Sequence, residues 1–253
     1  KVSKRYLDFD LNRSFLPQFI SKPLPDIYEH NRAKYLLDTY GPKGISPCKI
    51  AIDLHSTTSS MGSSIVIYGR RPADLALASL IQYRLGLSVY LHELDSYQKG
   101  FLVESWPCGL VVEIGPVPQN LLSQNIVKKT RLVLQVCIEE IAKVKQGKFN
   151  FPDNLIVHVH KKSIDYPRDY KGNPSASIHS LLEGNDFKPI KKGDPIFWKL
   201  NGEVIKYKED QSLIPVFINE AAYAEKNIAF SLTKKETWTF MDSWRRDLMI
   251  KLS

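Results

Sequence analysis

The stretch Lys49-Ile50-Ala51-Ile52-Asp53-Leu54-His55-Ser56-Thr57-Thr58-Ser59 determines the fold that we expect for the first half of the chain. It is a short apolar segment between Pro47 and a cluster of Ser and Thr, which is typical of a buried strand that ends in a polar loop. In an α/β sheet, functional groups gather at the carboxyl ends of such strands. Asp53 and His55 are two residues apart, so an extended strand directs both side chains to one face.

This pair of polar side chains allows two interpretations. A His beside a carboxylate can be a zinc ligand, because the carboxylate fixes the orientation of the imidazole ring. The same pair can also be a hydrogen-bonded His that closes the end of a strand. The stretch by itself leaves both interpretations open.

Composition narrows the class of protein. The chain has 253 residues with 43% hydrophobic content, enough to bury a core in one large domain or two smaller ones. No apolar run reaches the length of a membrane span, and no signal-peptide pattern opens the chain. The three cysteines, Cys48, Cys108 and Cys137, are widely spaced, which argues against a disulfide framework and for a reducing, cytoplasmic compartment.

The charge indicates the kind of partner. The formal net charge is +8, yet the Lys and Arg residues are scattered and no nucleic-acid-binding motif is present. We therefore expect a small anionic substrate rather than a nucleic acid or a membrane surface. The composition leaves a homo-oligomeric assembly open.

The beginning of the chain is unusual. It starts at Lys1 rather than Met and reaches the charged segment Arg5-Tyr6-Leu7-Asp8-Phe9-Asp10-Leu11-Asn12-Arg13 almost at once. We therefore expect the natural protein to carry an amino-terminal part that this chain lacks. The two arginines of the segment suit a carboxylate ligand, because a guanidinium group binds a carboxylate through two parallel hydrogen bonds. Alternatively, Asp8 and Asp10 satisfy the arginines within the loop.

Strands and helices are expected to alternate up to residue 147. The expected strands are 49–55, 64–68, 87–91 and 109–115, and the expected helices begin after Asp26, at Pro72 and at Leu121. This alternation predicts an α/β sheet with parallel strands. His30 lies off the apolar stripe of the first helix, and we expect it to be solvated.

Glu113 is a carboxylate inside the otherwise apolar strand 109–115. Burial would raise its pKa, which is how a general acid or base is poised near neutral pH. The alternative is a structural carboxylate paired with a nearby arginine. The strand alone leaves both roles open.

The second half of the chain has a different pattern of expected secondary structure. Short alternating segments, turn sequences and the hairpin signal Asn201-Gly202 predict a mainly β domain over residues 148–253, after a first domain over residues 1–147. His158 and His160 are two residues apart and could face a metal together. Lys161 and Lys162 follow directly and no third ligand is evident, so we expect a solvated edge strand here.

Six segments, taken in order, resemble the aspartoacylase/succinylglutamate desuccinylase family of zinc amidohydrolases, which have a carboxypeptidase-like fold. They are Arg5 to Arg13 as quoted above, Asp53-Leu54-His55-Ser56-Thr57-Thr58-Ser59-Ser60-Met61-Gly62, Val112-Glu113-Ile114-Gly115-Pro116-Val117-Pro118-Gln119, Ile164-Asp165-Tyr166-Pro167-Arg168-Asp169, Lys192-Gly193-Asp194-Pro195 and Pro215-Val216-Phe217-Ile218-Asn219-Glu220-Ala221-Ala222-Tyr223. The resemblance implies a three-layer α/β/α domain like that of zinc carboxypeptidases over residues 1–147. A smaller, mainly β domain over residues 148–253 would close over the active-site cleft.

The resemblance also implies roles for residues that match the family's motifs. His55 would be a ligand of one zinc ion per subunit of the complete enzyme, with Asp53 as its supporting carboxylate. Glu113 would be the general base that activates the attacking water and then the acid that protonates the leaving amine. Arg5 would polarise the scissile carbonyl and stabilise the oxyanion.

The substrate is implied by the same resemblance. Asn12 and Arg13 would hold the α-carboxylate of an amino acid, and Tyr223, from the β domain, would close over it. The implied reaction is hydrolysis of the amide bond of an N-acyl amino acid, typically N-acetyl-aspartate to acetate and aspartate.

Two departures from the family pattern leave alternatives open. The family's other zinc ligands come from a His-x-x-Glu motif upstream of the Arg5 segment; none occurs here, and the nearest sequence, His92-x-x-Asp95, lies on another element. Val103 stands where the family has an arginine that clamps the substrate side chain, and Lys99 is the nearest candidate to replace it. The chain is therefore expected to be a zinc hydrolase for N-acetyl-aspartate or other N-acyl amino acids, or a metal-free relative that binds carboxylates or acts in regulation.

Overall fold

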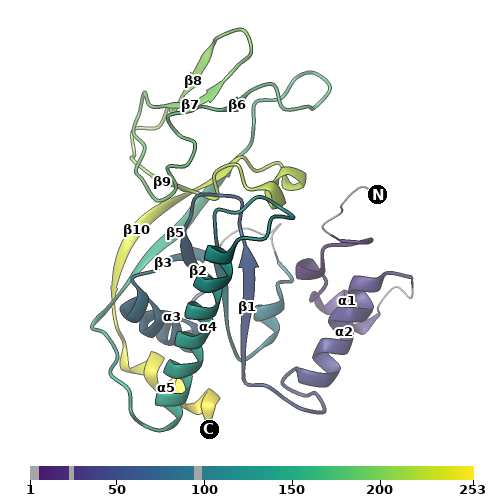
Figure 1. The fold of residues 1–253 in the computed structure, drawn as a ribbon, viewed down its shortest axis with the longest axis vertical. Helices are drawn as coiled ribbons and strands as arrows, with labels where there is room; N and C mark the ends of the chain where they lie inside the picture. The colour runs from purple at the N-terminus through teal and green to yellow at the C-terminus, as the bar shows by residue number, and fades with distance from the viewer. Residues whose placement is uncertain (1–5, 23–25, 94–98) are drawn as a thin grey trace.

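A mixed seven-stranded sheet forms the centre of the computed structural model, which describes residues 6–22, 26–93 and 99–253 (Figure 1). The strands, in their order across the sheet, are β1 (Ile50–Ser56), β4 (Cys108–Ile114), β2 (Ser63–Tyr68), β3 (Ser88–His92), β5 (Asn154–Ile164), β10 (Phe230–Thr239) and β9 (Ile214–Val216). The predicted α/β class is confirmed, and every strand predicted in the first half of the chain is present.

The direction of β2 departs from the expectation of parallel strands. β4 runs parallel to β1 but antiparallel to β2. The reason is the short connection 57–62 between β1 and β2, because a crossover to a parallel strand needs about a dozen residues or more. β3 and β5 continue parallel to β2, and β10 and β9 pair antiparallel at the far edge.

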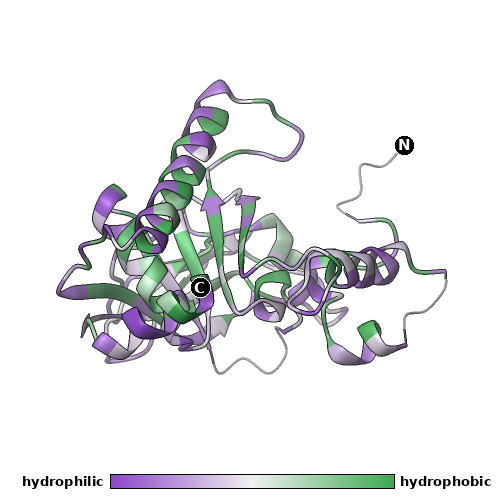
Figure 2. Cartoon of the chain, turned by 90° about the horizontal axis from the view of Figure 1, so that it is seen from below, coloured by the Kyte–Doolittle hydropathy of each residue, from purple (hydrophilic) through white to green (hydrophobic). Residues whose placement is uncertain are grey.

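One face of the sheet is apolar and is covered by three helices, α3 (Pro72–Leu85), α4 (Gln124–Lys145) and α5 (Asp242–Leu252). Alternate strand residues such as Ile65, Leu110 and Val157 are fully buried beneath them. Figure 2 shows the hydrophobic colouring concentrated in the sheet, with hydrophilic residues along the outer sides of the helices. This layer is the main hydrophobic core.

Local signals set the limits of these helices. Pro72 opens α3, and Gly86 follows its last residue with a φ of +67°, as predicted. α4 begins three residues later than expected, because the side chain of Ser123 accepts a hydrogen bond from N of Ile126 and caps the helix there. Within the described residues, every helix lacks the length or the apolarity to span a membrane.

The opposite face of the sheet, called the polar face below, carries side chains with hydrogen-bonding groups. The strand registers place His55, Glu113 and Ser64 side by side on β1, β4 and β2. Because side chains alternate along a strand, residues two positions away share this face. The polar face therefore comprises Asp53, His55, Ser64, Tyr68, Tyr90, His92, Glu113, His158 and His160.

His158 and His160 lie inside the sheet, so the expectation of a solvated edge strand was wrong. β5 has β3 on one side and β10 on the other, and the two residues are only 6% and 4% exposed. The hydroxyl group of Tyr90 is 2.9 Å from Nδ1 of His160 and 3.0 Å from Nδ1 of His92. Burial lowers the pKa of His158 to about 4, so its ring is neutral near pH 7.

The chain beyond residue 147 contributes to two sheets. Three of its strands complete the large sheet, and a three-stranded sheet at one end of the molecule is formed by β6 (Ser177–Ile178), β7 (Pro195–Trp198) and β8 (Val204–Lys206) (Figure 1). The hairpin predicted at Asn201-Gly202 is confirmed, because β7 and β8 pair antiparallel across it and Gly202 has a φ of +86°. Since the large sheet takes strands from both sides of residue 147, a division into two domains there stays a prediction.

The amino-terminal segment packs beside β1 and contains η1 (Leu11–Arg13), α1 (Pro17–Ser21) and α2 (Tyr28–Tyr40) (Figure 1). His30 of α2 is buried against the rings of Phe9 and Phe19, with centroid distances of 5.0 and 4.2 Å. The expectation of a solvated His30 was wrong, because the chain around α1 folds back over α2 and covers this ring.

Candidate active site

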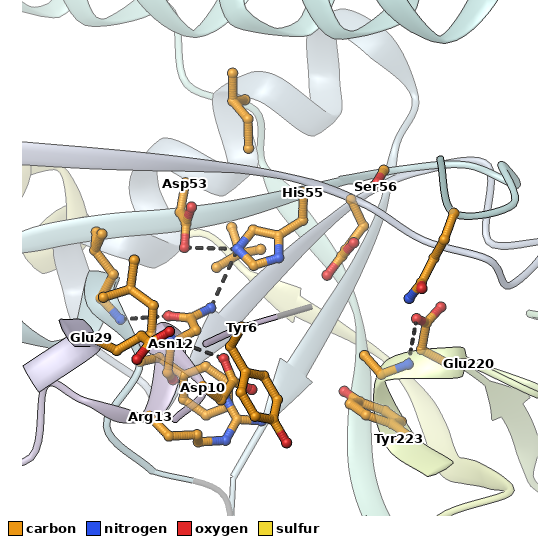
Figure 3. Close-up of a pocket in the computed structure, with 18 of the residues that line it drawn as sticks. Tyr6, Asp10, Asn12, Arg13, Glu29, Asp53, His55, Ser56, Glu220 and Tyr223 are labelled. Carbon is orange, nitrogen blue, oxygen red and sulfur yellow. Dashed lines mark hydrogen bonds and ion pairs between the residues drawn. The ribbon is translucent and has the colours of Figure 1, made fainter. Parts of the chain in front are cut away.

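A cavity of about 910 Å³ opens over the polar face, beside the carboxyl ends of β1 and β4 (Figure 3). Side chains from β1, β2, β4, η1, η2 (Leu102–Ser105) and η3 (Ala221–Lys226) line it. Five of the six predicted site residues are among them: Asn12, Arg13, His55, Glu113 and Tyr223. The sixth, Arg5, lies outside the described residues. Residues from both ends of the chain therefore meet in one cavity.

His55 lies at the carboxyl end of β1, where Asp53 holds its ring. Nε2 of His55 is 2.9 Å from Oδ2 of Asp53 (Figure 3). An ionised carboxylate only accepts hydrogen bonds, so the proton of a neutral ring resides on Nε2 and Nδ1 carries the lone pair. This is the tautomer of a metal-binding His whose other nitrogen donates to a carboxylate.

Asn12 lies beside His55 and is held by the backbone of η2. Its Oδ1 accepts a hydrogen bond from N of Leu102 at 2.8 Å, which leaves its Nδ2 3.3 Å from Nε2 of His55 (Figure 3). With the His55 proton on Nε2, the contact between these two nitrogens joins two donors and is not a hydrogen bond. The amide group of Asn12 can therefore donate to a ligand carboxylate without losing a partner at His55.

Arg13 supplies a positive charge to the cavity. Its guanidinium carbon is 3.9 Å from the ring centroid of Phe101, and its Nη1 donates to the carbonyl oxygen of Asn12 at 2.9 Å. Tyr68 stacks on Phe101 with 3.9 Å between ring centroids, so Arg13 and Tyr68 must occupy opposite faces of that ring. Arg13 is the single Lys or Arg among the described lining residues, which include five carboxylates: Asp10, Glu29, Asp53, Glu113 and Glu220.

The position of Arg13 depends on Glu29 of α2, which anchors the segment before η1. The Glu29 carboxylate accepts hydrogen bonds from the backbone N of Leu7 at 2.7 Å and of Phe9 at 3.2 Å. Burial raises the pKa of Glu29, but these backbone donors outweigh that effect and the net pKa is lowered. The carboxylate is therefore ionised near pH 7 and holds the segment that leads to Asn12 and Arg13.

Glu113 lies next to His55 on the neighbouring strand. The two residues are register partners in the parallel pair of β1 and β4, and paired strands lie about 4.8 Å apart. The Glu113 side chain is half-buried and lines the cavity. A water molecule can thus lie between this carboxylate and a ligand group near His55, as general base catalysis requires.

Glu220 joins the loop that follows His55 to the element that carries Tyr223. It is buried, and its Oε2 accepts hydrogen bonds from hydroxyl and backbone N–H groups of residues 57–59 at 2.5 to 3.3 Å. Its Oε1 accepts from N of Ala222 at 3.0 Å and caps η3 (Figure 3). Sequence reasoning assigned no role to Glu220, because the loop residues that it binds are more than 160 positions away.

The position expected to clamp a substrate side chain does not face the cavity. Val103 is buried in η2 and packs against Gly109, where an added Cβ would lie 2.7 Å from Cβ of Val103. Arg71 donates to the carbonyl oxygen of Val103 at 3.0 Å and helps to hold η2 in place. Lys99, the candidate replacement, is exposed and is not among the described residues that line the cavity.

Among the described residues, His55 has the environment expected of a metal ligand. Residues 6–22, 26–93 and 99–253 contain no group of three or more His, Cys, Asp or Glu side chains that could hold a metal ion together. His92 of the nearest His-x-x-Asp sequence contacts Tyr90 on the polar face, and Asp95 lies outside the described residues. The described donor set therefore fits one ligand of a zinc site, through Nδ1 of His55.

Comparisons with known proteins cover both halves of the chain. The family description "Succinylglutamate desuccinylase/Aspartoacylase catalytic domain" matches residues 1–141, and the AstE/AspA barrel-sandwich hybrid domain matches residues 153–235. A probable aspartoacylase of Prochlorococcus marinus (strain NATL2A) is 56% identical over 249 residues, which cover 98% of this chain and 82% of the relative. Another from strain MIT 9313 is 53% identical, with coverage of 96% and 80%.

Solved structures give the same architecture. Murine aminoacylase 3 aligns with a TM-score of 0.84 and 32% sequence identity, over 93% of this chain and 80% of that chain. The product-bound ectoine utilization protein EutE (DoeB) from Ruegeria pomeroyi aligns with a TM-score of 0.54 at 14% identity, over 92% and 70% of the two chains. At this low identity, the second alignment shows a shared fold alone.

Proposed function

Since the chain belongs to the succinylglutamate desuccinylase/aspartoacylase family, which comprises hydrolases of N-acyl amino acids, we propose that it hydrolyses such a substrate with the aid of one zinc ion. One observation carries the proposal: Asn12, Arg13, His55, Glu113 and Tyr223 line a single cavity. We place the reaction in the cytoplasm on the basis of the three cysteines, which are all free.

His55 and Glu113 supply the groups nearest to the reaction in this proposal. Nδ1 of His55, with its ring oriented by Asp53, would be one ligand of the zinc ion, which acts as a Lewis acid toward the scissile carbonyl. Glu113, beside His55, takes a proton from the attacking water and returns it to the leaving amine. Arg5 is proposed to stabilise the developing oxyanion.

Arg13 and Asn12 bind the α-carboxylate of the substrate in the same proposal. The guanidinium fork offers parallel N–H donors, and the ring of Phe101 keeps its plane fixed. The amide group of Asn12 adds an uncharged donor next to His55. Tyr223 lines the same cavity from η3 and closes over the bound amino acid.

Among the described residues, the cavity offers the substrate side chain little positive charge. The family resemblance implies N-acetyl-aspartate, which carries a second carboxylate. Val103 is buried, Lys99 does not line the cavity, and Arg13 is the single described Lys or Arg that does. We therefore propose that N-acetyl amino acids with uncharged side chains are hydrolysed at least as well as N-acetyl-aspartate.

Hydrolysis and zinc dependence can be tested together on the full-length natural protein. Release of free amino acid is measured with N-acetyl-aspartate, N-acetyl-asparagine and N-acetyl-leucine, before chelation, after chelation and after zinc is restored. We expect turnover that is lost with the metal and recovered with zinc. Tight binding of these compounds without any hydrolysis would identify a carboxylate-binding relative instead and overturn the proposed chemistry.

A further inference from the structure

Tyr68 has no role in the chemistry proposed above, yet it lies on the polar face and lines the cavity. It is four residues along β2 from Ser64, which is the register partner of Glu113. At about 3.3 Å per residue, Tyr68 is roughly 13 Å along the sheet from the proposed general base. This spacing separates the two backbones, but the Tyr68 phenol, whose pKa is raised by burial, is close enough to Glu113 for that carboxylate to raise the pKa of Tyr68 further.

The ring of Tyr68 is held on two sides. It stacks on Phe101 with a centroid distance of 3.9 Å and an interplanar angle of 23°, and its edge meets His92 at 5.7 Å. The opposite face of Phe101 carries the guanidinium group of Arg13. Tyr68 is thus next to the proposed carboxylate-binding residue, separated from it by one aromatic ring.

The hydroxyl group of Tyr68 is an uncharged hydrogen-bond donor. Burial raises its pKa well above the ordinary value, and the proximity of Tyr223 raises it further, so the phenol stays protonated over the working pH range. No hydrogen bond joins this hydroxyl to another group in the described ranges 6–22, 26–93 and 99–253. Tyr68 is half-buried and lines the cavity, so its hydroxyl group can donate to a ligand that displaces water there.

The surroundings of this hydroxyl favour an uncharged ligand group. Phe101, Val111 and Phe217 contribute apolar surface to the cavity near Tyr68. The nearest described guanidinium group, that of Arg13, is already assigned to the α-carboxylate. A second carboxylate placed here would lose its hydration without gaining a cation, whereas a carboxamide would need only a hydrogen bond.

We propose that Tyr68 is a specificity-determining residue whose phenolic O–H donates a hydrogen bond to an uncharged acceptor in the side chain of the N-acyl amino acid. This inference rests on the proposed function. It makes a carboxamide side chain, as in N-acetyl-asparagine, preferred over both a carboxylate and an apolar side chain of similar size.

Three substrates of similar size test the proposal. The ratio kcat/KM is measured for N-acetyl-asparagine, N-acetyl-aspartate and N-acetyl-leucine with the full-length natural protein, Tyr68→Phe and the control Tyr83→Phe, a tyrosine on α3 that is 67% exposed. In the wild type, we expect N-acetyl-asparagine to be the best of the three. Tyr68→Phe should lower its kcat/KM by about fivefold to tenfold, the scale of one uncharged hydrogen bond, and leave N-acetyl-leucine within about twofold. The control should change none of the three.

Two results would overturn the proposal: a wild-type preference for N-acetyl-aspartate, or an equal change for all three substrates in Tyr68→Phe. If the wild type hydrolyses none of them, the proposed chemistry fails but the inference about Tyr68 is still decided by binding. Dissociation constants from calorimetry should then show the same selective weakening for N-acetyl-asparagine in Tyr68→Phe. Equal affinities in the two proteins would refute the role of Tyr68.

Discussion

Replacement of Glu220 by alanine should destabilise the protein strongly and impair substrate binding. This buried carboxylate accepts hydrogen bonds from residues 57–59 and from N of Ala222, and so connects the loop after His55 to η3. Glu220→Ala removes every one of these acceptors. N of Thr58 in the loop and N of Ala222 in η3 then lose their acceptor, whereas N of Ser59 keeps Oγ1 of Thr57 at 3.1 Å.

The magnitude follows from the number of donors left without an acceptor. Each buried donor without a partner costs about 1–3 kcal/mol, and two partly buried backbone donors, N of Thr58 and N of Ala222, lose their acceptor. Water entering from the neighbouring cavity offsets part of this cost, so we expect a loss of roughly 2–4 kcal/mol in the free energy of unfolding. For a chain of this size, that corresponds to a decrease in Tm of roughly 10 °C.

Thermal unfolding followed by circular dichroism measures this loss, with Glu183→Ala as the matched control. Glu183 is an exposed glutamate in the same C-terminal part of the chain, and its replacement should shift Tm by less than about 2 °C. Because η3 carries Tyr223, the Glu220 variant should also show a raised KM at temperatures where it is still folded. A Tm within 2 °C of the wild type would refute the reasoning, since water would then replace the carboxylate at no net cost.

Three further substitutions test the proposed roles. Glu113→Gln in the full-length protein should lower kcat by about a hundredfold or more and leave zinc content and substrate affinity nearly unchanged, as metal analysis and steady-state kinetics would show. Arg13→Lys should raise KM more than Tyr223→Phe does, because Lys replaces a planar fork by a point charge and Phe removes only one hydroxyl group; initial rates over a range of substrate concentrations decide the order. Asp186→Asn should stabilise the protein at pH 8 by up to about 3 kcal/mol but much less at pH 4. Burial raises the pKa of Asp186 to about 6, so the folded state holds the carboxyl proton more tightly than the unfolded state does. The stability of the wild type therefore falls as the pH rises from about 4 to 6. Tm measured at about pH 4 and about pH 8 for the wild type and the variant checks the sign.

Local sequence signals were sufficient for most of the elements in the first half of the chain. The apolar run before His55 forms β1, and Pro72 and Gly86 bound α3, because strand ends and helix caps depend on neighbouring residues. The polar residues inside apolar strands, His55 and Glu113, could be singled out for the same reason. Their adjacency, however, depends on the register of β1 with β4, which periodicity alone does not determine.

Long-range packing explains the predictions that were wrong. His158 and His160 precede two lysines and look like part of a solvated strand, but β10, far along the chain, pairs with β5 and encloses them. His30 looks solvated on its own helix, but Phe9 and Phe19 cover it. In each case, the residues that decide burial come from a different segment, so a window along the sequence cannot reveal them.

In the roles proposed here, the reacting groups and the specificity residue come from different strands of the polar face. His55 and Glu113 lie at the carboxyl ends of β1 and β4, whereas Tyr68 lies at the far end of β2. A substitution at His55 or Glu113 removes an interaction made in the transition state, so it lowers kcat. The contact from Tyr68 to the substrate side chain is present both in the bound substrate and in the transition state, so its loss mainly raises KM. Because Phe101 lies between Arg13 and Tyr68, carboxylate binding and side-chain recognition both depend on this one aromatic ring.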